Sequence, residues 1–190
     1  MDIVVKDLCK RYGGQTVLER VSFTAGSGVT CVMAPSGAGK TTLLRILLGL
    51  EPPDNGTVSG LAGRRLSAVF QEDRLLEHLD AQGNLRFVLG PAYVEQEAQT
   101  LLTELGLAGE EEKPVRDWSG GMKRRLSLAR ALLVPFDVLV LDEPFTGLDG
   151  ENRRRCRDCI RRRAAEKTVL LVTHDAADAA GLDAGILTLT

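Results

Sequence analysis

The segment that most constrains this chain is a glycine-rich loop between an apolar stretch and a helical pattern. Residues 28–33 have the composition of a short buried strand, and residues 41–50 have the apolar density of a buried helix. A glycine-rich loop in this setting is typical of a phosphate site, because it lets consecutive N–H groups face phosphate oxygens at the positive end of a helix. The loop comprises Ala34, Pro35, Ser36, Gly37, Ala38, Gly39, Lys40, Thr41 and Thr42.

Two side chains at the end of this loop add charge and metal-binding capacity. We expect the Lys40 ammonium to reach the terminal phosphates of a nucleotide. The Thr41 hydroxyl is placed for Mg²⁺, a hard ion that prefers oxygen ligands. The usual first glycine of such a loop is replaced by Ala34. An alanine is accommodated there if the backbone φ is negative, because only a positive φ penalises a side chain.

A second informative segment places two acids at the end of an apolar strand. Residues 138–141 are all apolar, and Asp142 and Glu143 follow them. Ligands of open α/β sheets bind at the carboxyl ends of the strands. We therefore predict that Asp142 helps to hold Mg²⁺, and that Glu143 orients or deprotonates the attacking water in a phosphoryl transfer.

The rest of the chain alternates strand and helix patterns, which predicts a mainly parallel α/β sheet in a single domain over residues 1–190. Residues 80–105 read as helical with a break at Gly90-Pro91, so that about 72–133 form an inserted helical subdomain. The predicted strands are 2–8, 17–23, 28–33, short segments within 57–70, 138–141, 168–172 and 186–189, and the other predicted helices are 41–50, 121–133, 150–166 and a short one near 176.

Composition excludes several classes of function. The 24 basic and 26 acidic residues give a net charge of −2, so nucleic acid is not an expected partner. No apolar run approaches the roughly 18 residues of a membrane span, and the N-terminus has no signal-peptide pattern. The expected location is therefore the cytoplasm.

Packing and solvent exposure account for most of the four cysteines and for an arginine-rich stretch. Cys9 and Cys31 lie in predicted strands and are expected to pack as small apolar residues. Cys156 and Cys159 form a C-x-x-C motif among arginines that would favour thiolates, so a redox role stays open beside a purely structural one. The arginines themselves are expected to form a solvated helix face beside Glu151, Asp158 and Glu166.

A third segment identifies the family. Ser119 is a candidate N-cap, and Gly120 and Gly121 leave a bare helix N-terminus that can receive an anion. With Trp118 before them and Met122 after them, they resemble the signature segment of ATP-binding cassette (ABC) ATPases. Further matches follow in the family's order over residues 3 to about 175: Tyr12 resembles its adenine-stacking aromatic, Gln71 its glutamine loop, Asp149 its dimer-contact loop and His174 its switch histidine.

The resemblance implies a P-loop NTPase core with an N-terminal antiparallel β subdomain. It also implies ATPase activity in a head-to-tail dimer, of two copies or of paralogous cassettes, with ATP between the phosphate loop of one subunit and residues 119–122 of the other. Gln71 would sense the γ-phosphate and Mg²⁺, and His174 would contact the γ-phosphate and help to hold Glu143 and water in line.

The implied partner is an integral membrane permease on the inner face of the cell membrane, with a solute-binding protein acting indirectly. Residues 69–76 resemble the glutamine loop of importers for nitrate, sulfonate and taurine. Two alternatives stay open. One is an ABC ATPase that drives a non-transport complex, as in lipoprotein release or cell division, and the other is a nucleotide-gated binding module with little turnover.

Overall fold

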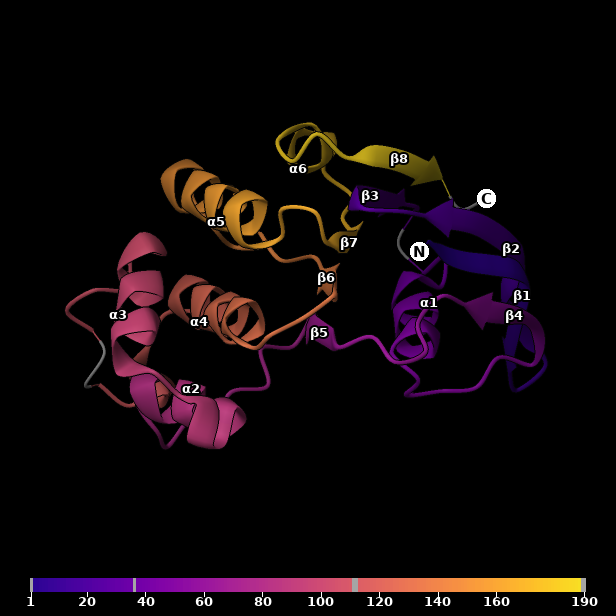
Figure 1. The fold of residues 1–190 in the computed structure, drawn as a ribbon. Coiled ribbons are helices and arrows are strands. Elements are labelled where there is room, and N and C mark those ends of the chain that lie inside the picture. The colour runs from indigo at the N-terminus through magenta and orange to yellow at the C-terminus, as the bar shows by residue number, and fades with distance from the viewer. Residues whose placement is uncertain (1, 36, 111–112, 189–190) are drawn as a thin grey trace.

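The computed structural model describes residues 2–35, 37–110 and 113–188. Within them the chain forms a five-stranded parallel sheet of order β5-β6-β7-β3-β8 and a three-stranded antiparallel sheet of order β2-β1-β4 (Figure 1). The predicted α/β fold is therefore confirmed. The parallel strands are β3 (Gly28–Met33), β5 (Leu66–Val69), β6 (Val138–Asp142), β7 (Thr168–Val172) and β8 (Gly185–Thr188), and the antiparallel ones are β1 (Ile3–Tyr12), β2 (Gln15–Ala25) and β4 (Asn55–Ser59).

The parallel sheet lies between two apolar clusters. Successive residues of a strand face opposite sides of its sheet. Leu139 and Leu141 accordingly join the cluster that packs on α4 and α5, whereas Val138 and Val140 join the cluster formed with α1 and the antiparallel sheet. The helices on the sheet are α1 (Lys40–Leu47), α4 (Gly120–Leu133), α5 (Gly150–Arg163) and α6 (Ala176–Ala180).

Two central strands bring distant parts of the sequence to one edge of the sheet. Every residue of β6 and of β7 is buried, as their apolar sequences predict. They pair in parallel with Asp142 opposite Val172. The residues that follow both strands therefore emerge side by side, at the edge where the phosphate loop follows β3.

The helices within residues 81–133 lie away from the antiparallel sheet, and α5 lies on the same side of the molecule (Figure 1). The helical pattern of 80–105 divides at Gly90-Pro91, where a 3₁₀ turn separates α2 from α3. Both helices contact α4. Within the described ranges no helix is long and apolar enough to cross a bilayer. The elements are α2 (Ala81–Leu89), the 3₁₀ turn Gly90–Ala92, α3 (Glu95–Glu104), the 3₁₀ turn Val115–Asp117 and α4.

Some predicted boundaries were wrong. Strands β1 and β2 extend well beyond the predicted 2–8 and 17–23, because shifts in their pairing and a positive φ at Asp7 obscure the apolar alternation. Helix α1 stops at Leu47 instead of residue 50, two residues before Gly49 with φ 69°. Helix α5 ends at Arg163, before Glu166, whose φ of 63° is incompatible with a helix.

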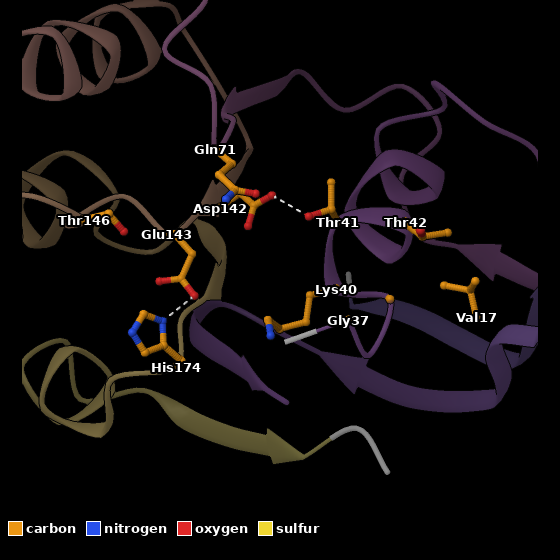
Figure 2. Close-up of a pocket in the computed structure, with 11 residues that line it drawn as sticks. Val17, Gly37, Lys40, Thr41, Thr42, Gln71, Asp142, Glu143, Thr146 and His174 are labelled. Atoms are coloured by element: carbon orange, nitrogen blue, oxygen red, sulfur yellow. Dashed lines mark hydrogen bonds and ion pairs between the residues drawn. The ribbon is translucent and has the colours of Figure 1, made fainter. Parts of the chain in front are cut away.

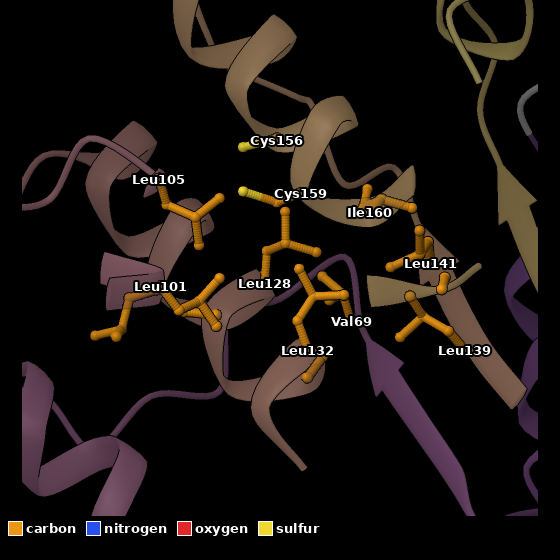
Figure 3. Packing of buried hydrophobic residues seen from close by; sticks show 14 of the residues in the cluster. Val69, Leu101, Leu105, Leu128, Leu132, Leu139, Leu141, Cys156, Cys159 and Ile160 are labelled. Atoms are coloured by element: carbon orange, nitrogen blue, oxygen red, sulfur yellow. The ribbon is translucent and has the colours of Figure 1, made fainter. Parts of the chain in front are cut away.

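Cys156 and Cys159 lie on the face of α5 that packs against the interior, beside Leu105 and Leu128 (Figure 3). Both thiols are fully buried and unbridged. Burial raises the pKa of Cys156 to about 12 and also raises that of Cys159. The expectation that nearby arginines favour thiolates was therefore wrong, since burial outweighs the cationic neighbours.

The arginines of α5 bind acids of the same chain. Arg155 contacts Glu151 at 2.6 Å and Arg161 contacts Asp158 at 3.3 Å, as the sequence predicts. Arg153 reaches Asp175 at 2.6 Å. These pairs agree with a solvated helix face that is neutralised locally.

Candidate functional site

A cavity of about 610 Å³ opens where the phosphate loop faces the carboxyl ends of the parallel strands (Figure 2). Its walls come from segments far apart in the sequence. These are β2, the start of α1, the segment after β5, the end of β6 and the segment after β7. Such an edge is where ligands of open α/β sheets bind. The lining residues are Val17, Gly37, Gly39, Lys40, Thr41, Thr42, Gln71, Asp142, Glu143, Thr146 and His174.

The phosphate loop needs its glycines for different reasons. Gly37 and Gly39 have φ values of 83° and 78°, in the left-handed region that favours glycine. A Cβ on Gly39 would also lie 2.7 Å from the Val17 carbonyl oxygen, so no other residue fits there without a shift of the backbone. Ala34 is not among the described non-glycine residues with positive φ, which meets the condition for an alanine at that position.

The remaining loop residues show how the loop is closed. The Lys40 ammonium donates hydrogen bonds to the carbonyl oxygens of Ala34 at 2.6 Å and Pro35 at 2.8 Å. The amide of Ala38 donates to the Pro35 carbonyl at 3.2 Å. Lys40 therefore links the start of α1 to the first residues of the loop. Ser36, which the sequence also places in this site, lies outside the described residues.

Thr41 and Asp142 form an oxygen-rich pair across the cavity. The Thr41 hydroxyl donates to Asp142 Oδ2 at 3.1 Å. Asp142 is only 3% exposed, and burial raises the pKa of its carboxyl group. A divalent cation would stabilise this desolvated carboxylate, and the hydroxyl, carboxylate and Gln71 amide oxygens that line the cavity are hard donors of the kind that Mg²⁺ prefers. The residues present therefore fit that ion.

Glu143 and His174 meet beside this pair. The imidazole Nδ1 of His174 lies 2.8 Å from Glu143 Oε1, and the Thr173 hydroxyl donates to Glu143 Oε2 at 3.4 Å. The hydrogen bond with Glu143 raises the pKa of His174. Glu143 has φ 48°, an uncommon backbone conformation for a side-chain-bearing residue, and such strain is concentrated at functional sites.

A buried arginine of α4 holds the segment that carries Gln71. Arg124 donates to the Phe70 carbonyl at 2.6 Å and also to the Gln71 carbonyl, and it pairs with Asp73 at 3.3 Å. No sequence motif singled out this residue. Only the pairing of distant segments in the fold reveals it.

The family follows from comparison with known proteins. The model of the ABC transporter family matches residues 18–146. The chain belongs to the ABC transporter family. It is an ATP-binding, ATP-hydrolysing subunit, which agrees with the cavity described above.

Curated relatives of this ABC subunit include importer ATPases. It is 43% identical over 187 residues to the aliphatic sulfonates import ATP-binding protein 1 of Rhodococcus jostii. The aligned region covers 95% of this chain and 76% of that relative. It is 39% identical to the sulfate/thiosulfate import ATP-binding protein of Mycobacterium tuberculosis, over 93% of this chain. The match spans only 55% of that second relative's length.

Solved structures share the fold. The ATP-binding subunit of an ABC transporter superposes with a TM-score of 0.87 at 28% identity, covering 100% of this chain and 86% of that one. A dimeric bacterial ABC transporter cassette superposes with a TM-score of 0.86 at 25% identity, covering 98% of this chain and 94% of the other.

The predicted signature residues, 119–122, stand apart from the cavity of their own chain. Ser119 is the N-cap of α4, where its hydroxyl accepts a hydrogen bond from the Met122 amide at 3.3 Å. Gly120 and Gly121 form the first turn, and a Cβ on Gly121 would lie 3.4 Å from the Gly147 carbonyl oxygen. The described residues that line the cavity include none of these four.

Asp149 and Tyr12, two other predicted site residues, also lie outside the lining. Asp149 is the N-cap of α5 and accepts a hydrogen bond from the Asn152 amide at 2.8 Å. Tyr12 ends β1, is 43% exposed and donates its hydroxyl proton to Glu51 at 2.6 Å. Val17 and Thr146 line the cavity although no motif indicated them.

Proposed function

We propose that this chain hydrolyses ATP in a cassette dimer that drives a separate membrane permease importing a small nutrient. The observation that carries the proposal is the convergence of the phosphate loop, Asp142, Glu143, Gln71 and His174 on one cavity. The import ATP-binding proteins among its relatives support the direction of transport.

The chain's own residues account for nucleotide binding and for activation of water. The backbone amides of Gly37, Ala38 and Gly39 and the Lys40 ammonium bind the phosphates, while Thr41, Asp142 and Gln71 would hold Mg²⁺. When bound, that ion neutralises charge on the phosphate oxygens. Glu143 takes a proton from the attacking water, and His174 keeps the Glu143 carboxylate oriented and contacts the γ-phosphate.

The second half of each site comes from another cassette. The capped N-terminus of α4, with Ser119 at its start, presents free backbone amides and a positive dipole end to an anion. Because these residues do not line their own chain's cavity, we assign them to the nucleotide of a partner cassette. Asp149 lies in the loop that contacts that partner.

The helical subdomain and the segment after Gln71 transmit the state of the site to a permease. Arg124 ties this segment to α4, so a shift at Gln71 moves the helices that flank it. We place the subunit on the cytoplasmic face of the membrane through this permease, with a solute-binding protein acting at a distance.

Co-purification tests this proposal. The tagged chain, expressed with the genes of its own neighbourhood, should retain an integral membrane subunit, and vesicles containing the pair should accumulate solute only with ATP and Mg²⁺. A retained complex that turns over ATP without moving solute would favour lipoprotein release or cell division. Phosphate release that stays at background with the complex present would favour the nucleotide-gated binding module.

A further inference from the structure

A polar cluster outside the cavity fixes the orientation of Tyr12. The tyrosine ends β1 and is followed by Gly13 and Gly14, whose φ values of 52° and 87° allow a tight turn. Its hydroxyl donates to Glu51 Oε1 at 2.6 Å. Glu51 lies in the connection between α1 and β4, so this hydrogen bond joins the hairpin to the segment that leaves the phosphate-loop helix.

Lys10 completes the cluster. It is 8% exposed, lies 3.3 Å from both Glu51 and Asp54, and donates to the Pro52 carbonyl at 2.8 Å. Its ammonium lies 5.5 Å from the centroid of the Tyr12 ring, within the range of a cation–π contact. Glu51 is thereby held between a tyrosine hydroxyl and a largely buried cation.

The cluster is also fastened to the backbone of β1. The Arg11 amide donates to Asp54 at 2.7 Å, which fastens the neighbouring acid to β1. The pKa of Tyr12 is raised, chiefly by the hydrogen bond with Glu51, and Thr42, which lines the cavity, acts in the opposite direction. Glu51, Lys10 and Tyr12 are all absent from the described lining of the cavity, and of the three only Tyr12 offers an aromatic ring, 43% exposed, on which a base can stack.

We infer that Glu51, held by Lys10, is a positioning residue that fixes the Tyr12 ring as the stacking platform for the adenine base of ATP. This inference rests on the proposed function as an ATPase, together with the predicted contact of Tyr12 with the adenine base. An exposed ring that is free to rotate loses conformational entropy when it stacks on a ligand, whereas a ring already held by hydrogen bonds does not. Glu51 therefore contributes to the base-dependent part of ATP affinity and leaves phosphate binding unaffected.

The test compares ATP with inorganic tripolyphosphate, which has phosphates and no base. Binding to the whole chain is measured by calorimetry. Glu51→Ala should weaken ATP binding about fivefold, the value of one hydrogen bond, and change tripolyphosphate binding less than about twofold. Tyr12→Phe keeps the ring and removes the tethered hydroxyl, so it should match Glu51→Ala.

A double variant and a control make the result specific. Because both single changes break the same hydrogen bond, Glu51→Ala in the Tyr12→Phe background should weaken ATP binding no further. Glu19→Ala, which alters an exposed acid of β2, should behave as the parent chain does. Equal weakening of ATP and tripolyphosphate, or full additivity of the two changes, would overturn the inference.

Tyr12→Ala separates this inference from the proposed function. If Tyr12→Ala weakens ATP binding selectively while Glu51→Ala and Tyr12→Phe do not, the platform stands and the positioning role of Glu51 fails. If Tyr12→Ala leaves the ratio of ATP to tripolyphosphate affinity unchanged, the predicted contact of Tyr12 with the base fails, and the inference fails with it, whereas ATP hydrolysis by the dimer is untouched by this result.

Discussion

His174 Nδ1 and Glu143 Oε1 lie 2.8 Å apart, although 31 positions separate the two residues in the sequence. The contact follows from strand pairing, because Asp142 of β6 is opposite Val172 of β7 and the next residues emerge at one edge. His174 is 75% exposed in its side chain and Glu143 only 17%. The pair therefore presents a solvent-facing imidazole against a sheltered carboxylate.

This contact should be visible in the titration of His174. The hydrogen bond and charge of Glu143 raise the histidine pKa above its ordinary value of 6.5. Because the His174 pKa is higher in the folded than in the unfolded chain, protonation of His174 stabilises the fold, fully so at pH values below the unfolded-state pKa. This stabilisation is lost as the pH rises through the folded-state pKa. NMR titration should give His174 a pKa above 6.5, and Glu143→Gln should lower it. A pKa unaffected by this substitution would contradict the contact.

Glu143→Gln should also separate binding from turnover. The amide cannot accept a proton from water, so hydrolysis should fall by roughly 100-fold or more. Binding of ATP should persist, because the phosphate loop is unchanged. Phosphate release and calorimetry measure the two quantities, and Asp183→Asn, at a carboxylate that is 86% exposed, serves as the matched control. Turnover near that of the parent chain would remove Glu143 from its assigned role.

The sequence singles out those candidate site segments that are contiguous in the chain. Residues 34–42 and 138–143 combine a strand with a characteristic turn or acid pair, so local pattern was sufficient. The contacts of Arg124 with the Gln71 segment and of Glu51 with Tyr12 join elements brought together only by folding, and neither follows a fixed spacing. The predicted C-terminal boundary of β1 was wrong for a similar reason, since the pairing shift near Asp7 depends on β2.

Arg124 should be required for stability as well as for coupling. Its side chain is 8% exposed, and its guanidinium pairs with Asp73 and donates to two backbone carbonyl groups. Removing one partner of a buried pair leaves the other charge uncompensated, so Arg124→Ala should lower the free energy of unfolding by about 3 kcal/mol. Arg124→Lys should recover only part, because an ammonium lacks the planar fork. Denaturant unfolding measures both, and Arg154→Ala, at an exposed arginine of α5, should shift stability by less than about 0.5 kcal/mol.

The buried cysteines should be unreactive in the folded chain. Burial raises the pKa of Cys31 to about 11 and that of Cys156 to about 12, so few thiolates form at pH 8. A thiol reagent should label the half-exposed Cys9 first and the other three only after denaturation. Rapid labelling of Cys156 or Cys159 under native conditions would reopen a redox role for the C-x-x-C motif.

Ser119→Arg should separate nucleotide binding by one chain from hydrolysis by the dimer. The exposed N-terminus of α4 would then carry a long cationic side chain where a partner's phosphate is expected, and the cap hydrogen bond to Met122 would be lost. Hydrolysis that rises with protein concentration should disappear, while ATP binding by the monomer should remain, because Ser119 does not line its own cavity. Ser119→Ala is the matched control, since it removes the cap, worth about 1 kcal/mol, without adding bulk. Sedimentation with ATP and phosphate release report the two effects, and retained dimer-dependent hydrolysis in Ser119→Arg would contradict a role for this helix end at the partner's nucleotide.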